Sequence, residues 1–284
     1  MKVKDIINLF LTDLKLTYSE NEIRNFIFYS FEYLFGYNRT DMILKKEEII
    51  DTGNIQKLNE ILYSLKQQKP IQYILGKTEF YGLPFNVNNN VLIPRPETEE
   101  LVRWIILENR GKVDTILDIG TGSGCIAISL KKNMSETEIF ALDNSVKAIE
   151  TARENASLNM TSINFILADI LGNTESLILP NFDIIVSNPP YVRKSEKLLM
   201  KSNVLNYEPH EALFVSNDDA LLFYKAITDF ALKKLNPSGK LYFEINEMYG
   251  SEIVEMIKGK GLHEVEIRKD ISGKDRMLRC FNIH

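Results

Sequence analysis

The chain of 284 residues is long enough for one large domain or two smaller ones with an ample core. A hydrophobic content of 44% and a charged content of 26% are ordinary for a soluble globular protein. The net charge of −5 argues against a protein that wraps a nucleic-acid backbone along a basic stripe, although it leaves room for a local basic patch.

Cysteine and histidine residues are few and scattered. Cys125 and Cys280 give no disulfide framework, which fits a reducing cytoplasm. His210, His263 and His284 do not form a metal-ligand pattern, so we expect no metal site.

The first 16 residues are apolar but carry the charged residues Lys4, Asp5, Asp13 and Lys15. We therefore expect neither a signal peptide nor a membrane-spanning helix, and no membrane partner.

Residues 1–72 are predicted to form a helical domain, because they carry three apolar stripes with helical spacing. Ser19 and Glu22 have the spacing of a capping box before the second stripe, and Gly36 ends it. Two hypotheses stay open: the stripes only bury one another, or a bundle this rich in Phe and Tyr docks a macromolecular substrate. The stripes consist of Val3, Ile6, Ile7, Phe10, Leu11 and Leu14; of Ile23, Phe26, Ile27, Phe31 and Leu34; and of Ile55, Leu58, Ile61, Leu62 and Leu65.

Residues 73–92 are predicted to form a hairpin that links two domains. Two short extended runs, residues 78–81 and 85–87, are separated by Gly82 and Pro84.

A proline-rich stretch begins the second predicted domain, residues 93–284. Pro96 suits the first turn of a helix and Glu97 suits its positive end, and we expect this helix to run to Gly111. Arg95 lies between two prolines, so the backbone fixes its direction. We take Arg95 as a candidate substrate-binding residue.

From residue 115 onward, short apolar runs alternate with helical segments, which is typical of a parallel sheet covered by helices on both faces. The turn at residues 272–275 is short enough for a hairpin, so the last strand is predicted to run antiparallel to its neighbour. The expected strands cover residues 115–119, 138–142, 163–167, 183–187, 239–245, 262–268 and 276–282. The predicted fold class is α/β, with a Rossmann-like seven-stranded sheet and a small N-terminal helical domain joined by a β-hairpin.

A glycine loop follows the first predicted strand and precedes a helix expected over residues 125–132. Its spacing, G-x-G-x-G, is one residue shorter than the dinucleotide fingerprint G-x-G-x-x-G. Asp118 is an awkward neighbour for a pyrophosphate but favours a ligand with positive charge. S-adenosylmethionine carries an ammonium and a sulfonium, so we favour it over NAD as the cofactor. The candidate cofactor-binding residues in this stretch are Asp118, Gly120, Thr121, Gly122, Ser123 and Gly124.

Further candidate cofactor residues lie at the carboxyl ends of the next two strands. Asp143 follows the loop by roughly 20 residues, where an acidic side chain reaches ribose hydroxyls in Rossmann-like folds. It could also cap the helix that Asn144 and Ser145 open, and we add Asn144 to the cofactor-binding set. Asp169 and Ile170 end the third strand and are expected beside the adenine.

A rigid corner, Asn188-Pro189-Pro190-Tyr191, ends the apolar run at residues 183–186. The prolines lack an N–H, so strand pairing stops while the carbonyl groups remain free acceptors. The Asn188 side-chain oxygen and the Pro189 carbonyl suit the two hydrogens of a planar –NH2 group, on which Tyr191 can stack. We take Asn188, Pro189 and Tyr191 as catalytic candidates, Pro190 as a further substrate-binding residue, and Asn188 also as a neighbour of the cofactor. A plain strand-ending turn is the alternative for this tetrapeptide taken alone.

Together these residues resemble the release-factor glutamine N5-methyltransferases (the PrmC or HemK family). The resemblance covers most of the chain and rests on residues 70–76, Leu92–Glu99, the Asp118–Gly124 loop, Asn188–Tyr191, Tyr207-Glu208-Pro209, Ala212-Leu213 and residues 273–276. It implies methyl transfer from S-adenosylmethionine to the glutamine of the Gly-Gly-Gln motif in class I peptide chain release factors, a cytoplasmic reaction that supports translation termination. It also implies that Asn188 and Pro189 hold the glutamine amide while its nitrogen attacks the methyl carbon.

The chain departs from the family pattern at two places, where residues 215–218 replace a glycine pair and Glu244-Ile245-Asn246 replaces Glu-x-Gly.

Residues 193–206 are polar and poorly periodic, and form either a mobile flap over the substrate or an ordinary surface loop.

The corner alone fits adenine and cytosine amino-methyltransferases of DNA or RNA equally well, with the base flipped out onto Tyr191. The acidic balance and the lack of an evident target-recognition domain favour a protein substrate without direct nucleic-acid binding. A binder that has lost activity is disfavoured, because Asn188, Asp143 and the glycine loop are all intact.

Overall fold

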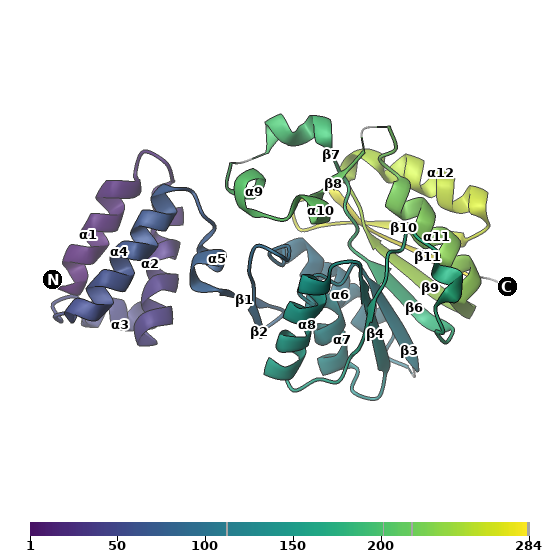
Figure 1. The fold of residues 1–284 in the computed structure, drawn as a ribbon, viewed down its shortest axis with the longest axis horizontal. Helices are drawn as coiled ribbons and strands as arrows, with labels where there is room; N and C mark the ends of the chain where they lie inside the picture. Colours follow the sequence, from purple (N-terminus) through teal and green to yellow (C-terminus); the bar gives the residue numbers. More distant parts are fainter. Residues whose placement is uncertain (112, 201, 217, 283–284) are drawn as a thin grey trace. The chain divides into compact units, whose positions relative to one another are not determined.

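The computed structural model describes residues 1–111, 113–200, 202–216 and 218–282, which form two compact units (Figure 1). One is a helical unit that consists of Met1–Gly76 and the short helix α9 (Ser202–Tyr207). The other is an α/β unit that holds the rest of the described chain, from Lys77 onward.

The helical unit confirms the three predicted helices, each with its apolar stripe in a shared core. Ser19 forms the expected capping box with Glu22, and Gly36 ends α2 with a φ of +68°, a conformation that glycine adopts without strain. The helices are α1 (Val3–Leu14), α2 (Glu20–Phe35), α3 (Arg39–Leu44), α4 (Thr52–Lys66) and α5 (Ile71–Leu75), and the most buried core residues include Ile6, Leu14, Phe31, Leu58 and Leu65.

Two helices of this unit, α3 and α5, have no counterpart in the sequence prediction. Each is too short to show a helical period: α3 has six residues and α5 has five. α3 buries no side chain and starts at a capping box between Asn38 and Asp41. α9 joins the unit through Tyr207, whose hydroxyl donates to the Gln67 carbonyl at 2.7 Å.

The predicted hairpin is present as β1 (Lys77–Phe80) and β2 (Leu83–Asn86). Phe80 and Phe85 are buried in a core of the α/β unit. The Asn155 side chain accepts a hydrogen bond from the Asn86 N–H at 2.6 Å and donates one to the Asn86 carbonyl at 3.0 Å. These contacts bind the hairpin to α8 (Val146–Leu158) as part of the α/β unit.

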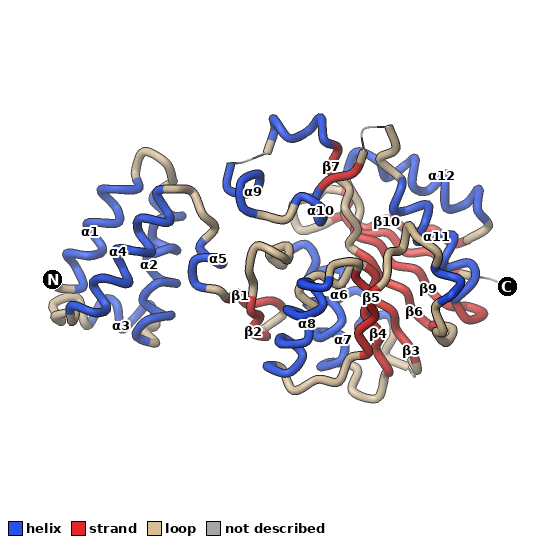
Figure 2. The backbone as a smooth tube through the Cα atoms, viewed as in Figure 1, coloured by secondary structure: helices blue, strands red, loops and turns tan. Residues whose placement is uncertain are grey.

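The α/β unit contains the predicted seven-stranded sheet, with strand order β10-β11-β9-β6-β3-β4-β5 (Figure 2). β11 is antiparallel to both of its neighbours, as predicted, and the other neighbouring strands are parallel. The strands are β3 (Thr115–Ile119), β4 (Glu138–Asp143), β5 (Asn164–Leu167), β6 (Phe182–Ser187), β9 (Leu235–Glu244), β10 (His263–Lys269) and β11 (Asp275–Phe281).

Helices cover both faces of this sheet (Figures 1 and 2), and each face has its own core. Neighbouring residues of β3 point to opposite faces: Ile116 belongs to the core under α6, α7 and α8, whereas Leu117 belongs to the core under α11 and α12. The helices not yet bounded are α6 (Pro96–Glu108), α7 (Cys125–Asn133), α11 (Leu222–Lys234) and α12 (Gly250–Lys260).

Several boundaries differ from the sequence prediction. α6 ends at Glu108 rather than Gly111, because the Asn109 backbone leaves the helical region, with a φ of −118° and a ψ of 46°. The Asn109 side chain donates to the Ile105 carbonyl at 2.7 Å, which satisfies an acceptor of the last turn. β9 begins at Leu235, four residues early, and its pairing with β6 is irregular near Phe182.

The polar stretch at residues 193–206 contains short helices rather than plain loop. These are the 3-10 helix Lys194–Leu199 and α9, whereas residue 201 lies outside the described residues. β7 (Val192–Arg193) pairs in parallel with β8 (Phe214–Val215), which follows α10 (His210–Leu213). Residues 215–218, where the sequence departs from the family pattern, include residue 217, which also lies outside the described residues.

Two further 3-10 helices, Thr174–Ser176 and Glu247–Tyr249, complete the described secondary structure. No helix in the described parts of the chain combines the length and the apolar character that crossing a membrane requires.

Candidate active site

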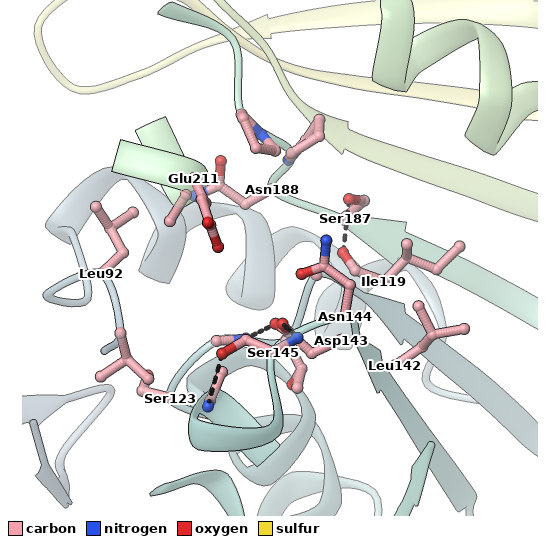
Figure 3. A pocket seen from close by; sticks show the side chains of 18 of the residues that line it. Leu92, Ile119, Ser123, Leu142, Asp143, Asn144, Ser145, Ser187, Asn188 and Glu211 are labelled. Atoms are coloured by element: carbon pink, nitrogen blue, oxygen red, sulfur yellow. Dashed lines mark hydrogen bonds between the residues drawn. The ribbon is translucent and has the colours of Figure 1, made fainter. Parts of the chain in front are cut away.

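A concave cavity opens where the parallel strands β3, β4 and β6 end (Figure 3). The register of the sheet creates it: Ile119 at the end of β3 lies abreast of Leu142 on one side and Ser187 on the other. The Ser187 hydroxyl also donates to the Ile119 carbonyl at 2.7 Å. The three chain segments that follow these strands therefore emerge side by side, as the crevice rule for such sheets predicts.

The glycine loop forms the floor of the cavity. Gly120 and Gly122 both line it with φ angles of +74° and +54°. The Gly120 N–H donates to the Leu142 carbonyl at 2.8 Å, and a Cβ added at either glycine would meet no protein atom within 4 Å. The missing side chains thus leave that part of the cavity open for a ligand.

Gly124, in contrast, does not line the cavity and serves helix packing. A Cβ there would lie 3.0 Å from Ile128 and 3.2 Å from Ala152, so a side chain would push α7 away from α8. The cavity geometry therefore indicates a packing role for Gly124 rather than the predicted contact with the cofactor.

Asp143 lines the cavity and fastens the glycine loop to β4. One carboxylate oxygen accepts the Gly122 N–H at 2.9 Å and the other accepts the Ser145 N–H at 2.9 Å. Ser145, not Asp143, caps α8, because the Ser145 hydroxyl accepts the Ala148 N–H. Burial raises the pKa of Asp143, and the hydrogen bonds from Ser145 and Gly122 act against that rise. Each oxygen keeps a lone pair for a ligand hydroxyl.

Asp118 is fully buried beneath the loop and does not line the cavity. Its carboxylate accepts a 2.6 Å hydrogen bond from the Thr121 hydroxyl. Burial raises the pKa of Asp118 to about 7, which the Thr121 hydrogen bond partly counteracts. In this arrangement Asp118 supports the loop from below and does not reach the cavity, where it was expected to contact a cationic ligand.

The corner at Asn188 brings its carboxamide to the opposite wall of the cavity, with Pro189 and Pro190 beside it. The Asn188 Nδ2 donates to the Thr98 hydroxyl oxygen at 3.3 Å. This bond leaves the Asn188 Oδ1 available to accept hydrogens from a ligand.

Tyr191 lies outside the cavity lining, and its predicted stacking on a planar substrate group stays a prediction. Its ring packs partly against the core under α11 and α12, and its hydroxyl donates to the Glu244 Oε1 at 3.3 Å. Burial and the nearby Glu244 charge both raise the pKa of Tyr191. The side chain therefore supports the corner from behind.

Arg95 reaches the cavity wall as predicted, but its guanidinium is engaged. The same nitrogen donates to both oxygens of Glu208, at 2.6 and 2.7 Å, and the Glu208 residue is only 4% exposed. The pair joins the start of α6 to the segment before α10, so Arg95 has a clear structural partner. Its contact with substrate stays a prediction.

The structure thus brings most predicted site residues to one cavity and leaves three outside it. The residues in the lining are Arg95, Gly120, Thr121, Gly122, Ser123, Asp143, Asn144, Asp169, Ile170, Asn188, Pro189 and Pro190; the residues outside are Asp118, Gly124 and Tyr191.

Several lining residues were not predicted from the sequence. Glu211 projects into the cavity in Figure 3. Thr98 lines the cavity and holds Asn188, and Phe223 adds an apolar wall from α11. Thr98 belongs to the resemblance stretch Leu92–Glu99, and Glu211 adjoins the stretch Ala212-Leu213, but no local pattern showed that either residue lines the cavity.

No group of three or more His, Cys, Asp or Glu side chains suited to a metal ion occurs among the described residues. His284, one of the three histidines, is not described. Cys125 is buried and burial raises the pKa of its thiol to about 12, so it behaves as an apolar side chain.

The cavity fits a nucleoside cofactor. The open glycine cradle leaves room for the ligand, Asp143 offers acceptors for hydroxyls, and Ile119, Leu142 and Ile170 provide apolar walls.

A methyltransferase from Pyrococcus furiosus of known structure shares the fold, with a TM-score of 0.53 and 22% identity over 80% of this chain and 98% of that one. The likeness shows that the two proteins share an α/β fold.

Sequence comparisons identify the family. A model described as methyltransferase small domain matches residues 100–208, and one described as PrmC N-terminal domain matches residues 12–76. Proteins named release factor glutamine methyltransferase are 49% identical in Flavobacterium psychrophilum (98% of this chain, 99% of that protein) and 44% identical in Bacteroides thetaiotaomicron (86% and 87%). The chain belongs to the release factor glutamine methyltransferase family. It is therefore an S-adenosylmethionine-dependent methyltransferase.

The buried Asp118 leads to a prediction about stability and pH. Its folded-state pKa of about 7 lies above the ordinary value of 3.8, so the unfolded chain loses this proton at lower pH than the folded protein does. The free energy of unfolding therefore loses this contribution as pH rises from about 4 to about 7. Asp118→Asn has no proton to lose, and its stability relative to wild type should improve across that window by a few kcal/mol, on the order of 1.4 kcal/mol per unit.

Urea denaturation of both proteins between pH 4 and pH 8 measures this difference. Asp218→Asn, at an exposed position, is the control and should give a much flatter difference. Parallel stability profiles for wild type and Asp118→Asn would contradict the assignment.

Proposed function

We propose that this protein transfers a methyl group from S-adenosylmethionine to the side-chain amide nitrogen (N5) of the glutamine in the Gly-Gly-Gln motif of class I peptide chain release factors. The observation that carries this proposal is the orientation of the Asn188 carboxamide, whose Nδ2 is bound to Thr98 and whose Oδ1 is left to accept. Members of the family bear the name of this reaction. A cytoplasmic location follows from the proposal, because translation termination takes place there.

The cofactor would be held by the glycine loop from below and by Asp143 through its ribose hydroxyls. Asn144, Asp169 and Ile170 would border the nucleoside from the ends of β4 and β5. When bound, S-adenosylmethionine supplies an electrophilic methyl group. The Glu211 carboxylate gives the cavity a negative charge that favours a cationic ligand.

The amide corner would position the substrate nitrogen. The Asn188 Oδ1 and the Pro189 carbonyl would each accept one hydrogen of the glutamine –NH2 group, which fixes the plane of the amide. An amide nitrogen is a weak nucleophile, so alignment has to supply much of the rate, and such alignment is worth roughly 7–11 kcal/mol. Arg95 and Pro190 would border the bound glutamine, and Tyr191 would hold the corner from behind through Glu244.

A DNA or RNA amino-methyltransferase remains the alternative that the Asn-Pro-Pro-Tyr corner alone allows. The family membership and the net charge of −5 both favour a protein substrate.

Mass spectrometry of an intact class I release factor after incubation with this protein and S-adenosylmethionine tests the proposal. We expect one added methyl group on the Gly-Gly-Gln glutamine and none on a DNA control. Asn188→Ala should abolish transfer while cofactor binding, measured by calorimetry, largely persists. Asp143→Ala should instead weaken cofactor binding about tenfold or more, since it removes hydrogen bonds to a charged group.

Asn164→Ala is the matched control, because Asn164 is exposed on β5 and its side chain donates to Glu138 at the surface. It should keep both activity and cofactor affinity. Methylated DNA with an unmodified release factor would move the protein to the nucleic-acid alternative.

We further propose that the helical unit docks the body of the release factor. The unit has its own core, and α3 exposes two large apolar side chains, Ile43 at 71% and Leu44 at 76%. Exposed apolar groups that lie together are typical of interaction surfaces.

The double variant Ile43→Ser/Leu44→Ser should raise the KM for intact release factor several-fold and leave the rate with a short Gly-Gly-Gln peptide unchanged. The matched control is Ile178→Ser/Ile271→Ser, which removes two similarly exposed side chains from the α/β unit. An equal effect of both double variants, or none on the intact protein, would refute docking through α3.

A further inference from the structure

A chain of buried polar groups lies behind Asn188 and joins three separate elements of the α/β unit. The Thr98 hydroxyl, in the first turn of α6, donates to the Glu244 Oε2 at the end of β9 at a distance of 2.6 Å. The same hydroxyl oxygen accepts the Asn188 Nδ2 at 3.3 Å. Thr98 is 2% exposed and Glu244 is 1% exposed, so water does not compete for these bonds.

The order of donors and acceptors along this chain is set by Glu244. A carboxylate can only accept, and the Thr98 hydroxyl has a single proton, so that proton goes to Glu244. The Thr98 oxygen is then left as an acceptor, which selects the –NH2 end of the Asn188 carboxamide. The Tyr191 hydroxyl donates to the other Glu244 oxygen. Burial raises the pKa of Glu244, whereas the hydrogen bonds from Thr98 and Tyr191 and the nearby Arg276 charge act against that rise.

We propose that Thr98 and Glu244 are positioning residues that fix which end of the Asn188 carboxamide faces the substrate. This inference rests on the proposed function. The two ends of a carboxamide have nearly the same shape, so packing alone does not choose between them, whereas hydrogen bonds do. We call the hydrogen-bonded series Glu244–Thr98–Asn188 the relay. With the relay in place, the Asn188 Oδ1 faces the substrate –NH2 group. With the relay broken, the carboxamide is free to turn, and its own –NH2 group would then oppose that of the substrate.

Three Thr98 variants and one control test the relay. Thr98→Val keeps the side-chain shape but lacks the hydroxyl, and Thr98→Ser keeps the hydroxyl. Thr98→Cys, with a thiol that is a weak donor and acceptor, replaces the valine variant if that protein is too unstable to purify. Thr228→Val is the matched control, because Thr228 is fully buried and its hydroxyl bonds only to the Tyr224 carbonyl of its own helix.

The readouts are kcat and KM for the release factor, cofactor affinity by calorimetry, and the melting temperature. We expect Thr98→Val to lower kcat about tenfold or more, with cofactor affinity and the KM for the release factor within about threefold of wild type. Thr98→Ser should keep most of the wild-type kcat. Thr228→Val should also keep the wild-type kcat, even if its melting temperature falls as far as that of Thr98→Val.

Two results would overturn the relay while the proposed function stands: wild-type turnover in Thr98→Val, or an equal loss in Thr98→Ser and Thr98→Val. A wild-type protein that does not methylate the release factor would overturn the proposed function and this inference together.

Discussion

The register of β3 between β4 and β6 is the constraint on which the site depends. Ile119 pairs with Leu142 and with Ser187, so the glycine loop, Asp143 and Asn188 leave the sheet at one edge. A slip by one residue would turn every side chain of a strand to the opposite face, so the two cores that bury this sheet also fix the geometry of the cavity. The geometry of the proposed cofactor and amide sites is thus a consequence of how the apolar residues pack.

Hydrogen bonds then hold the emerging segments in place. Asp143 joins the glycine loop to the start of α8, and the Arg95–Glu208 pair joins α6 to the segment before α10. Thr98 and Glu244 do the same for the amide corner. These buried or partly buried polar groups hydrogen-bond to partners on separate elements, which keeps the site rigid before its ligands arrive.

Much of this arrangement could be predicted from the sequence, because its signals are local. Short apolar runs that alternate with helical segments marked all seven strands, and the glycine loop and the proline corner marked the floor and one wall of the cavity. The helices α3 and α5 were missed because they are too short to show a period. Asp118 and Tyr191 lie outside the cavity because of the direction that each side chain takes from the backbone, which the local sequence does not reveal. The Thr98–Glu244 hydrogen bond joins residues 146 positions apart, so it has no local signal either.

The central claim is that the Asn188 Oδ1 and the Pro189 carbonyl together hold the substrate –NH2 group. A crystal structure with S-adenosylhomocysteine and a Gly-Gly-Gln peptide tests it most directly. The account predicts that the glutamine side-chain nitrogen lies within hydrogen-bond distance of both oxygens, with the Asn188 Nδ2 still bound to Thr98. A glutamine whose carbonyl oxygen faces the Asn188 Nδ2, or one that binds away from this corner, would contradict it.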